Sequence, residues 1–345
     1  MKITRIETVP YCLKLRAPLC VGSLLLRERE GVLVRMESAS GAEGWGDAAP
    51  LAGYSRESIG QARSELEQFC AAPPPDVTGT PDDLFRSADG LPLLSSSARF
   101  AVESALASVA AAIAGKSLAA WLFGVDADRC PVNALISGEP EGWAERARAA
   151  RAEGFTVAKF KVGRAPISQE LAALRDVHAA APELLIRLDA NRAWSPLVAR
   201  GVADELAGLP LDYIEEPVRA GVALPAQWPR DMGVALDESL HGEGPVPDPA
   251  APVVAWVLKP TLVGGLVRAL RLAAQARTAG RRVIFSSAYE SGVGIRVLAE
   301  LAAVTGQPAG LDTHAALETD VLAPRLQFSR GALELAAARG SVVQR

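Results

Sequence analysis

The sequence predicts a closed barrel of alternating β-strands and α-helices that follows a small α+β unit. The first fifty residues show the apolar–polar alternation of half-buried strands. From about Cys130 onward, short apolar segments alternate instead with amphipathic helical segments. About eight such apolar segments occur, which favours a closed barrel over an open sheet. The alternative, a doubly wound sheet, has less support because no G-x-G-x-x-G motif follows an early strand.

The N-terminal unit is expected to contain three strands and two helices. Alternating patterns predict the strands at residues 2–15, 29–38 and 43–50. Helical patterns cover residues 55–70 and 95–114, and the Pro/Gly-rich segment 71–83 between them is expected to be a loop.

The barrel is expected to follow as repeated βα units. Its predicted strands are 131–136, 156–162, 184–190, 211–217, 233–239, 254–260, 281–287 and 309–313. Its predicted helices are 141–153, 168–180, 196–207, 264–279 and 292–305.

Composition excludes several classes of protein. The chain has 345 residues and a net charge of −4, without a Lys/Arg run, so nucleic-acid binding is not expected. Its four cysteines show no CxxC spacing, which argues against a zinc site or a disulfide framework. Neither a signal peptide nor a membrane-spanning segment is recognisable, which predicts a soluble cytoplasmic protein. The oligomeric state is left open.

Charged residues recur where the predicted strands end. The intervals from Asp189 to Glu215, to Asp237 and to Lys259 are 26, 22 and 22 residues, each about one βα unit. In a closed barrel such positions meet at the carboxyl ends of the strands. Three converging carboxylates need a cation, and an all-oxygen ligand set suits Mg²⁺. A helix N-cap or first-turn role is the alternative for each acid alone, and the recurrence of all three together with flanking lysines argues against it.

Lysines accompany these acids, although the chain has only six lysines. Lys159 and Lys161 are two residues apart, so both side chains lie on one face of a strand and Phe160 lies on the other. If the apolar face packs against helices, the lysines point into the barrel. Two neighbouring ammonium groups repel, so at least one is expected to have a lowered pKa and to act as a base.

Histidine is not expected to carry the chemistry. His178 lies in a predicted helix, and His241 lies in a Gly/Pro-rich loop after the fifth strand. His314 follows the eighth strand and is the one candidate for a supporting contact. Nucleophilic catalysis is not indicated either, because no G-x-S-x-G motif or Cys–His arrangement stands out.

Six motifs of the sequence, taken together, resemble those of a known superfamily. The series "AKFKVG", "RLDANRAW", "IEEP", "LDESL", "LKPTLVGG" and "FSSAYESGVG" resembles the enolase superfamily, in its muconate-lactonizing subgroup. Within that subgroup it is most similar to the o-succinylbenzoate synthases. The segment "EGWGDAAPLAGYSRES" is similar to the loop of the family's capping domain that closes over the substrate.

The resemblance implies a modified (β/α)7β TIM barrel with an N-terminal α+β capping domain. It implies a capping domain at residues 1–95, a barrel at 96–322 and a C-terminal tail, 323–345, that packs back on the capping domain. The loop around 19–29 would contribute to specificity. It also implies Mg²⁺ bound by Asp189, Glu215 and Asp237, with Mn²⁺ left open as a replacement.

The same resemblance assigns roles to further residues. Lys161 takes the position of the catalytic base, Lys259 that of the lysine across the site, and Lys159 lies beside them. Glu216 and Glu238 would support the metal ligands. Residues expected to contact the substrate are Arg187, Asn191, Gly264, Gly265, Ser286 and Ser287.

The implied reaction is a Mg²⁺-dependent syn-dehydration in menaquinone biosynthesis. It would convert 2-succinyl-6-hydroxy-2,4-cyclohexadiene-1-carboxylate to o-succinylbenzoate through an enediolate, which makes the enzyme a carbon–oxygen lyase acting on a small carboxylate. N-acylamino-acid racemisation or dipeptide epimerisation would use the same residues and stays open. Muconate cycloisomerisation and a non-catalytic barrel are weaker alternatives.

Overall fold

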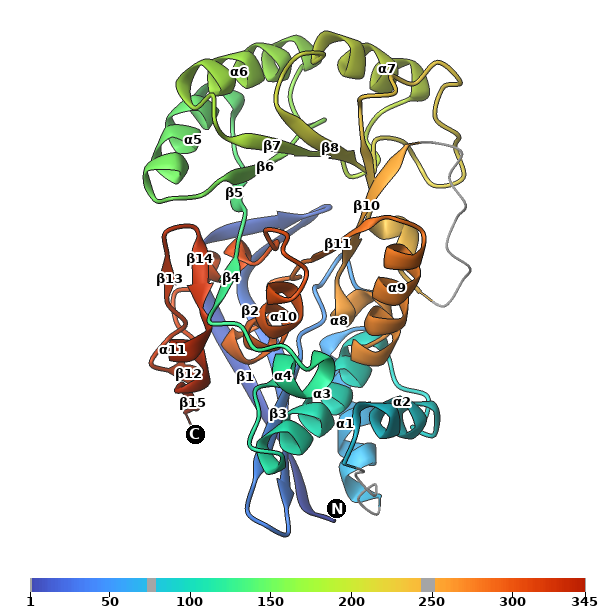
Figure 1. Ribbon diagram of the computed structural model, residues 1–345, viewed down its shortest axis with the longest axis vertical. Coiled ribbons are helices and arrows are strands. Elements are labelled where there is room, and N and C mark those ends of the chain that lie inside the picture. Colours follow the sequence, from blue (N-terminus) through green and yellow to red (C-terminus); the bar gives the residue numbers. More distant parts are fainter. Residues whose placement is uncertain (1, 73–78, 243–251, 345) are drawn as a thin grey trace.

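The computed structural model describes residues 2–72, 79–242 and 252–344 of the chain. It contains an antiparallel sheet of β1–β3 and a curled, all-parallel sheet of β5–β11 (Figure 1). In the view of Figure 1, α5, α6 and α7 lie on the outer side of the parallel strands. The predicted combination of a barrel with an N-terminal α+β domain is confirmed.

The parallel sheet has the strand order β11-β10-β9-β8-β7-β6-β5. Its strands are β5 (Ala134–Ile136), β6 (Val157–Lys161), β7 (Leu185–Asp189), β8 (Leu211–Glu215), β9 (Val234–Leu236), β10 (Val253–Leu258) and β11 (Arg282–Phe285). Its helices are α5 (Trp143–Ala152), α6 (Ile167–Ala180), α7 (Pro196–Glu205), α8 (Pro260–Val263), α9 (Leu266–Thr278) and α10 (Gly292–Ala303).

Two residues close this sheet into a barrel. Ala309 forms a parallel bridge with Val132, next to β5, and Gly310 forms one with Ser286, next to β11. The expected eighth strand at 309–313 is therefore only a pair of bridges that joins the two edges. It ends in the 3₁₀ turn η3 (Asp312–Ala316), in which backbone groups bond locally instead of along a strand.

The connections between strands are less regular than the predicted βα repeat. The described residues between β8 and β9 contain no helix, and only the 3₁₀ turn η2 (Glu238–Leu240) follows β9. The expected helix at 264–279 is α9, which begins at Leu266. The short helix α8 precedes it, and Gly264 and Gly265, with positive φ angles of 112° and 101°, separate the two helices.

The alternation in β6 orients the two lysines as predicted. Phe160 is fully buried on the outer face and packs against Trp143 of α5, with 5.4 Å between the ring centroids. Lys159 and Lys161 therefore point to the other face, into the barrel.

The antiparallel sheet consists of β1 (Ile3–Val21), β2 (Leu24–Ser38) and β3 (Glu43–Ala48). The helices α1 (Ile59–Ala71) and α3 (Ser96–Ile113) pack on it, and α2 (Pro81–Asp89) and α4 (Leu118–Phe123) pack against α3. The segment expected to be a loop around 19–29 is instead the end of a hairpin, because β1 and β2 stay paired as far as Val21 and Leu24. Within the predicted loop 71–83, residues 73–78 lie outside the described residues. Residues 81–83 begin α2, which Thr80 caps together with Asp83.

The C-terminal segment pairs with the start of the barrel. Its β14 (Ala332–Glu334) is antiparallel to both β13 (Phe328–Ser329) and β4 (Arg129–Pro131), and β12 (Leu322–Ala323) pairs with β15 (Val342–Val343). The short helix α11 (Leu335–Arg339) contacts α10. None of the helices in the described ranges combines the length and the hydrophobicity needed to cross a membrane.

Buried polar side chains join the antiparallel sheet to the loop after β11. Arg29 of β2 donates to the carbonyl oxygens of Ala49, Pro50 and Tyr289 at 2.8, 3.1 and 3.1 Å. Asp47 of β3 accepts from the backbone N–H and the hydroxyl of Ser291 at 2.8 and 2.7 Å. These bonds hold the loop against the N-terminal domain.

Glu290 lies in this interface, fully buried, and its Oε1 has no hydrogen-bond partner among the described residues. Burial raises the pKa of Glu290 to about 7, and the neighbouring charge of Asp47 adds to the rise. The folded state therefore binds more protons than the unfolded state between about pH 4.5 and 7, so stability falls as the pH rises through this window.

We expect Glu290→Gln to be more stable than the wild type at pH 8, by up to about 3 kcal/mol, because the neutral amide avoids burying a charge. Urea unfolding at pH 5.5 and pH 8 measures this difference, which should shrink at the lower pH. Exposed Glu139→Gln is the matched control. A Glu290→Gln variant that is equally destabilised at both pH values would contradict the expectation.

Candidate active site

The predicted site residues of β6, β7 and β8 lie side by side in register. Lys161 is paired with Asp189, and Asp189 is paired with Glu215, at the carboxyl ends of these strands. Asp237 and Lys259 follow the ends of β9 and β10, the next two strands of the sheet. The barrel thus brings all five residues to one end, where the sequence spacing predicted them.

Direct contacts join the lysines to the acids. Lys159 Nζ lies 2.7 and 2.8 Å from the two carboxylate oxygens of Glu215 and 3.0 Å from Asp189 Oδ2. Lys161 Nζ lies 3.1 Å from both Asp189 Oδ2 and Asn191 Oδ1. Lys259 forms an ion pair with Asp237. Asp189, Glu215 and Asp237 are fully buried, so these contacts are shielded from water.

The pKa of Lys159 is raised, so Lys159 is not a lysine of lowered pKa of the kind expected for at least one of Lys159 and Lys161. Burial lowers the pKa of Lys159, but the charges of Asp189 and Glu215 outweigh burial and raise it above its usual value. The pKa of Lys259 is raised in the same way, chiefly by Asp237. Carboxylate oxygens lie within 3.0 Å of Lys159 Nζ, and opposite charges this close favour the charged form of the amine.

The acids show the complementary effect. Burial raises the pKa of Asp189, yet Lys159, Lys161 and Lys259 together bring it below the ordinary value. Burial and the charges of Asp189 and Asp237 hold the pKa of Glu215 well above its ordinary value, despite the contact with Lys159. The positive charge around Glu215 is therefore too small to offset its burial and the two neighbouring acids.

The donor set fits a hard divalent cation. No group of three or more acidic, His or Cys side chains in the described ranges is arranged to hold a metal ion as it stands. Lysine ammonium groups instead contact carboxylate oxygens of Asp189, Glu215 and Asp237. Four carboxylates, counting Glu238, face three ammonium groups, which leaves one negative charge in excess. Glu238 Oε2 is buried without a hydrogen-bond partner in the part of the chain that the structure describes. The acid oxygens could therefore hold Mg²⁺.

Glu216 supports the end of β9 from the neighbouring strand. Its Oε1 accepts from the backbone N–H groups of Asp237 and Ser239 at 2.9 and 2.7 Å, and its Oε2 accepts from Arg192 at 2.9 Å. Glu216 and Arg192 both have positive φ, at 42° and 63°. Such strained backbone is held in place by its surroundings, and here it points Asp237 toward the site.

Two further side chains enter the site that the spacing of the acids could not indicate. Tyr54, from the N-terminal domain, donates to Glu238 Oε1 at 3.1 Å, and its ring lies 5.3 Å from Lys259 Nζ. His241 Nε2 lies 3.2 Å from Asp237 Oδ1, although its loop position argued against a role. Tyr54 lies within the segment that resembles the substrate-closing loop of the family, and this resemblance is the sequence feature that could have indicated its place in the site.

Arg187 and His314 are not brought to the carboxylates. Arg187 is in register with Lys159, but its guanidinium contacts Asp212, Asn133 and the carbonyl of Pro308, toward the amino-terminal end of the barrel. His314 instead contacts Asp320, at 2.9 Å.

The remaining candidates lie near strand ends without bonds to the acids, except Asn191. Asn191 Nδ2 donates to Glu238 Oε1 at 3.0 Å. Ser286 and Ser287 follow β11 and both donate to the carbonyl of Gly310. Gly265 approaches α3 so closely that an added Cβ would lie 2.6 Å from Glu103 Oε2.

Comparison with known families agrees with this geometry. Residues 142–344 match the family described as "Enolase C-terminal domain-like", and residues 3–74 match "MenC, N-terminal domain". The first match covers more than half of the chain.

The chain belongs to the enolase superfamily.

Individual members of the enolase superfamily are similar over nearly the whole length. An o-succinylbenzoate synthase of Yersinia pseudotuberculosis is 31% identical over 91% of both chains. Among solved structures, the L-Ala-D/L-Glu epimerase of Bacillus subtilis has a TM-score of 0.84 and 26% identity, over 97% of this chain and 96% of its own. A dipeptide epimerase of Methylococcus capsulatus, complexed with Mg and a dipeptide, has a TM-score of 0.82 and 26% identity over 97% of both chains.

Proposed function

We propose that this protein catalyses the o-succinylbenzoate synthase reaction, the Mg²⁺-dependent dehydration of 2-succinyl-6-hydroxy-2,4-cyclohexadiene-1-carboxylate. The observation that carries the proposal is the 31% identity to the Yersinia o-succinylbenzoate synthase over 91% of both chains. The match of residues 3–74 to the family described as "MenC, N-terminal domain" also supports it, because this part of the chain lies outside the barrel that carries the acids.

Asp189, Glu215 and Asp237 are the proposed Mg²⁺ ligands, and Glu216 and Glu238 support them. When bound, Mg²⁺ would stabilise the negative charge that develops on the substrate carboxylate. The dipeptide epimerases of similar structure that are complexed with Mg support this choice of metal.

Lys161 is the proposed base. Its side chain is 24% exposed, whereas that of Lys159 is 10% exposed and is bonded to both oxygens of Glu215. A substrate can therefore reach the Lys161 amine, while Lys159 stays with the acids and orients them. Asn191, bonded to both Lys161 and Glu238, holds the Lys161 side chain in position.

The reaction then needs two proton transfers. Neutral Lys161 takes the proton from the carbon next to the carboxylate, and cationic Lys259 stabilises the resulting enediolate. The C–O bond to the ring hydroxyl breaks, its electron pair leaves with the oxygen, and Lys161 returns the proton to form water. Loss of water makes the ring aromatic, which makes the dehydration favourable.

A direct assay tests the proposal. Purified protein with Mg²⁺ is expected to convert the cyclohexadiene carboxylate to o-succinylbenzoate, detected by the absorbance of the aromatic product, and to stop when EDTA removes the metal. Absence of dehydration by folded, Mg²⁺-loaded protein would overturn the proposal.

The second candidate is N-acylamino-acid racemisation or dipeptide epimerisation. The similarity to two epimerase structures at 26% identity favours it, as does the presence of Lys161 and Lys259 on separate strands of the barrel, from which a two-base reaction could proceed. Incubation with N-succinyl amino acids or dipeptides in D₂O distinguishes the two. Exchange of the α-proton with inversion, without dehydration of the cyclohexadiene, would favour this second function.

A further inference from the structure

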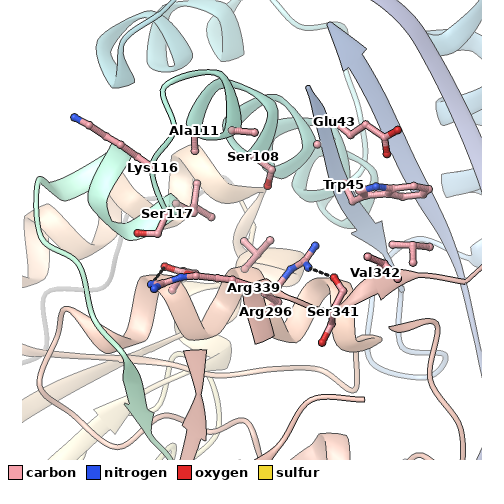
Figure 2. Close-up of a pocket in the computed structure, with 16 residues that line it drawn as sticks. Glu43, Trp45, Ser108, Ala111, Lys116, Ser117, Arg296, Arg339, Ser341 and Val342 are labelled. Atoms are coloured by element: carbon pink, nitrogen blue, oxygen red, sulfur yellow. Dashed lines mark hydrogen bonds and ion pairs between the residues drawn. The ribbon is translucent and has the colours of Figure 1, made fainter. Parts of the chain in front are cut away.

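A cavity of about 400 Å³ lies away from the carboxylates, where the antiparallel sheet, α3, α10 and the C-terminal segment meet (Figure 2). None of its lining residues belongs to the candidate active site. Its volume falls within the range of small-molecule sites. Its walls combine an aromatic surface with positive charge. The lining residues include Trp45, Ser108, Arg296, Glu300, Arg339 and Ser341.

Arg296 is the central cation of this cavity. Figure 2 shows its side chain reaching from α10 toward the space beside Trp45. Its Nη1 donates to the carbonyl oxygens of Ser341 at 3.0 Å and Ala338 at 3.5 Å, and it forms no ion pair among the described residues. Burial lowers the pKa of Arg296, and the charges of Glu300 and Asp320 only partly oppose this. A guanidinium in this state gains from a nearby anion.

The acids on the cavity wall are already matched by other cations. Glu300, four residues after Arg296, forms its ion pair with Arg339 at 2.8 Å and also accepts from the backbone N–H of Ala119. Glu43 is bound to Arg35. Each of these acids thus already has a cationic partner other than Arg296.

Ser341 supplies a second, independent observation. Its side chain is 5% exposed, and its Oγ has no hydrogen-bond partner in the part of the chain that the structure describes. Buried hydroxyls are normally satisfied, so the Ser341 hydroxyl would gain a partner if its side chain rotated toward a ligand in the cavity. Trp45, Val297 and Leu118 provide apolar wall for the rest of a ligand.

We propose that this cavity binds a small cyclic carboxylate, with the carboxylate on Arg296 and Ser341 and the ring against Trp45. Arginine recognises carboxylates with paired hydrogen bonds, and the indole offers a flat surface to a ring. Because the cavity is lined by both domains and by the C-terminal segment, the ligand would hold these parts together and raise the melting temperature.

Calorimetric titration of the Mg²⁺-loaded full chain with sodium benzoate tests the proposal. We expect binding with a dissociation constant below about 1 mM, at least about tenfold weaker binding in Arg296→Gln, and unchanged binding in exposed Arg277→Gln. Uncharged benzamide should bind at least tenfold more weakly than benzoate. Equal affinity of Arg296→Gln and wild type, or of benzamide and benzoate, would overturn the proposal.

Two further measurements distinguish binding in this cavity from binding at the barrel carboxylates. Ser108→Leu fills the cavity without removing Arg296, and it should abolish the same binding while turnover stays within twofold of wild type. Because the barrel end also attracts carboxylates, crystals soaked with 4-bromobenzoate locate the site by the anomalous signal of bromine. A peak between Trp45 and Arg296 supports the proposal, and peaks only at the barrel carboxylates would contradict it.

Discussion

Replacing Lys161 by alanine is expected to lower turnover by at least about a thousandfold, because the reaction loses its proposed base. Mg²⁺ affinity should change little, since Asp189 keeps its contact with Lys159 at 3.0 Å. Steady-state kinetics at saturating Mg²⁺ measure the first effect, and calorimetric titration with Mg²⁺ measures the second.

The matched control is Lys14→Ala, the same change at an exposed position of β1, which should leave turnover unaltered. Adding a small primary amine such as methylamine should restore part of the lost activity in Lys161→Ala, because it fills the space of the missing amine. Full activity in Lys161→Ala would end the assignment of this lysine as the base. Normal Mg²⁺ binding with no rescue by amine would still agree with it.

Asp237→Asn is expected to weaken Mg²⁺ binding by about tenfold to a hundredfold, since the amide offers one neutral oxygen where the carboxylate offers two charged ones. Turnover should fall with it, because Asp237 also pairs with Lys259. Titration of the metal-free variant with Mg²⁺ gives the affinity without relying on activity.

Asp176→Asn makes the identical chemical change on the exposed surface of α6 and serves as control. Circular dichroism and melting temperature establish that Asp237→Asn is folded, which we expect because the backbone N–H of residue 237 still bonds to Glu216. Wild-type Mg²⁺ affinity in folded Asp237→Asn would remove this residue from the ligand set.

The sequence was most informative where a strict period applies. Strand alternation assigned Lys159 and Lys161 to the barrel interior, and Phe160, packed on Trp143, shows why the other orientation is disfavoured. The spacing of one βα unit predicted that Asp189, Glu215 and Asp237 would share one end of the barrel. Both inferences depend on geometry that every strand of a barrel repeats.

Other features depend on where a side chain ends along the barrel axis, or on contacts between distant segments, and the periodic pattern of the sequence does not indicate either. Arg187 has the same phase as Asp189, yet its long side chain extends toward the opposite end of the barrel, because phase specifies a face and not a direction along the axis. Tyr54 and His241 reach the acids from irregular segments. The helix α2 was missed although Thr80 and Asp83 form a capping box, because neighbouring prolines and glycine suggested a loop.

The bridges of Ala309 and Gly310 have a consequence for how the chain folds. The two edges of the parallel sheet can be joined only after nearly all of the barrel sequence is available, because the joining residues come after β11. Such long-range contacts are slow to form, since the intervening chain must be ordered before they contribute. Until that step, β5 and β11 expose unpaired backbone edges, so partly synthesised chains are prone to associate with one another.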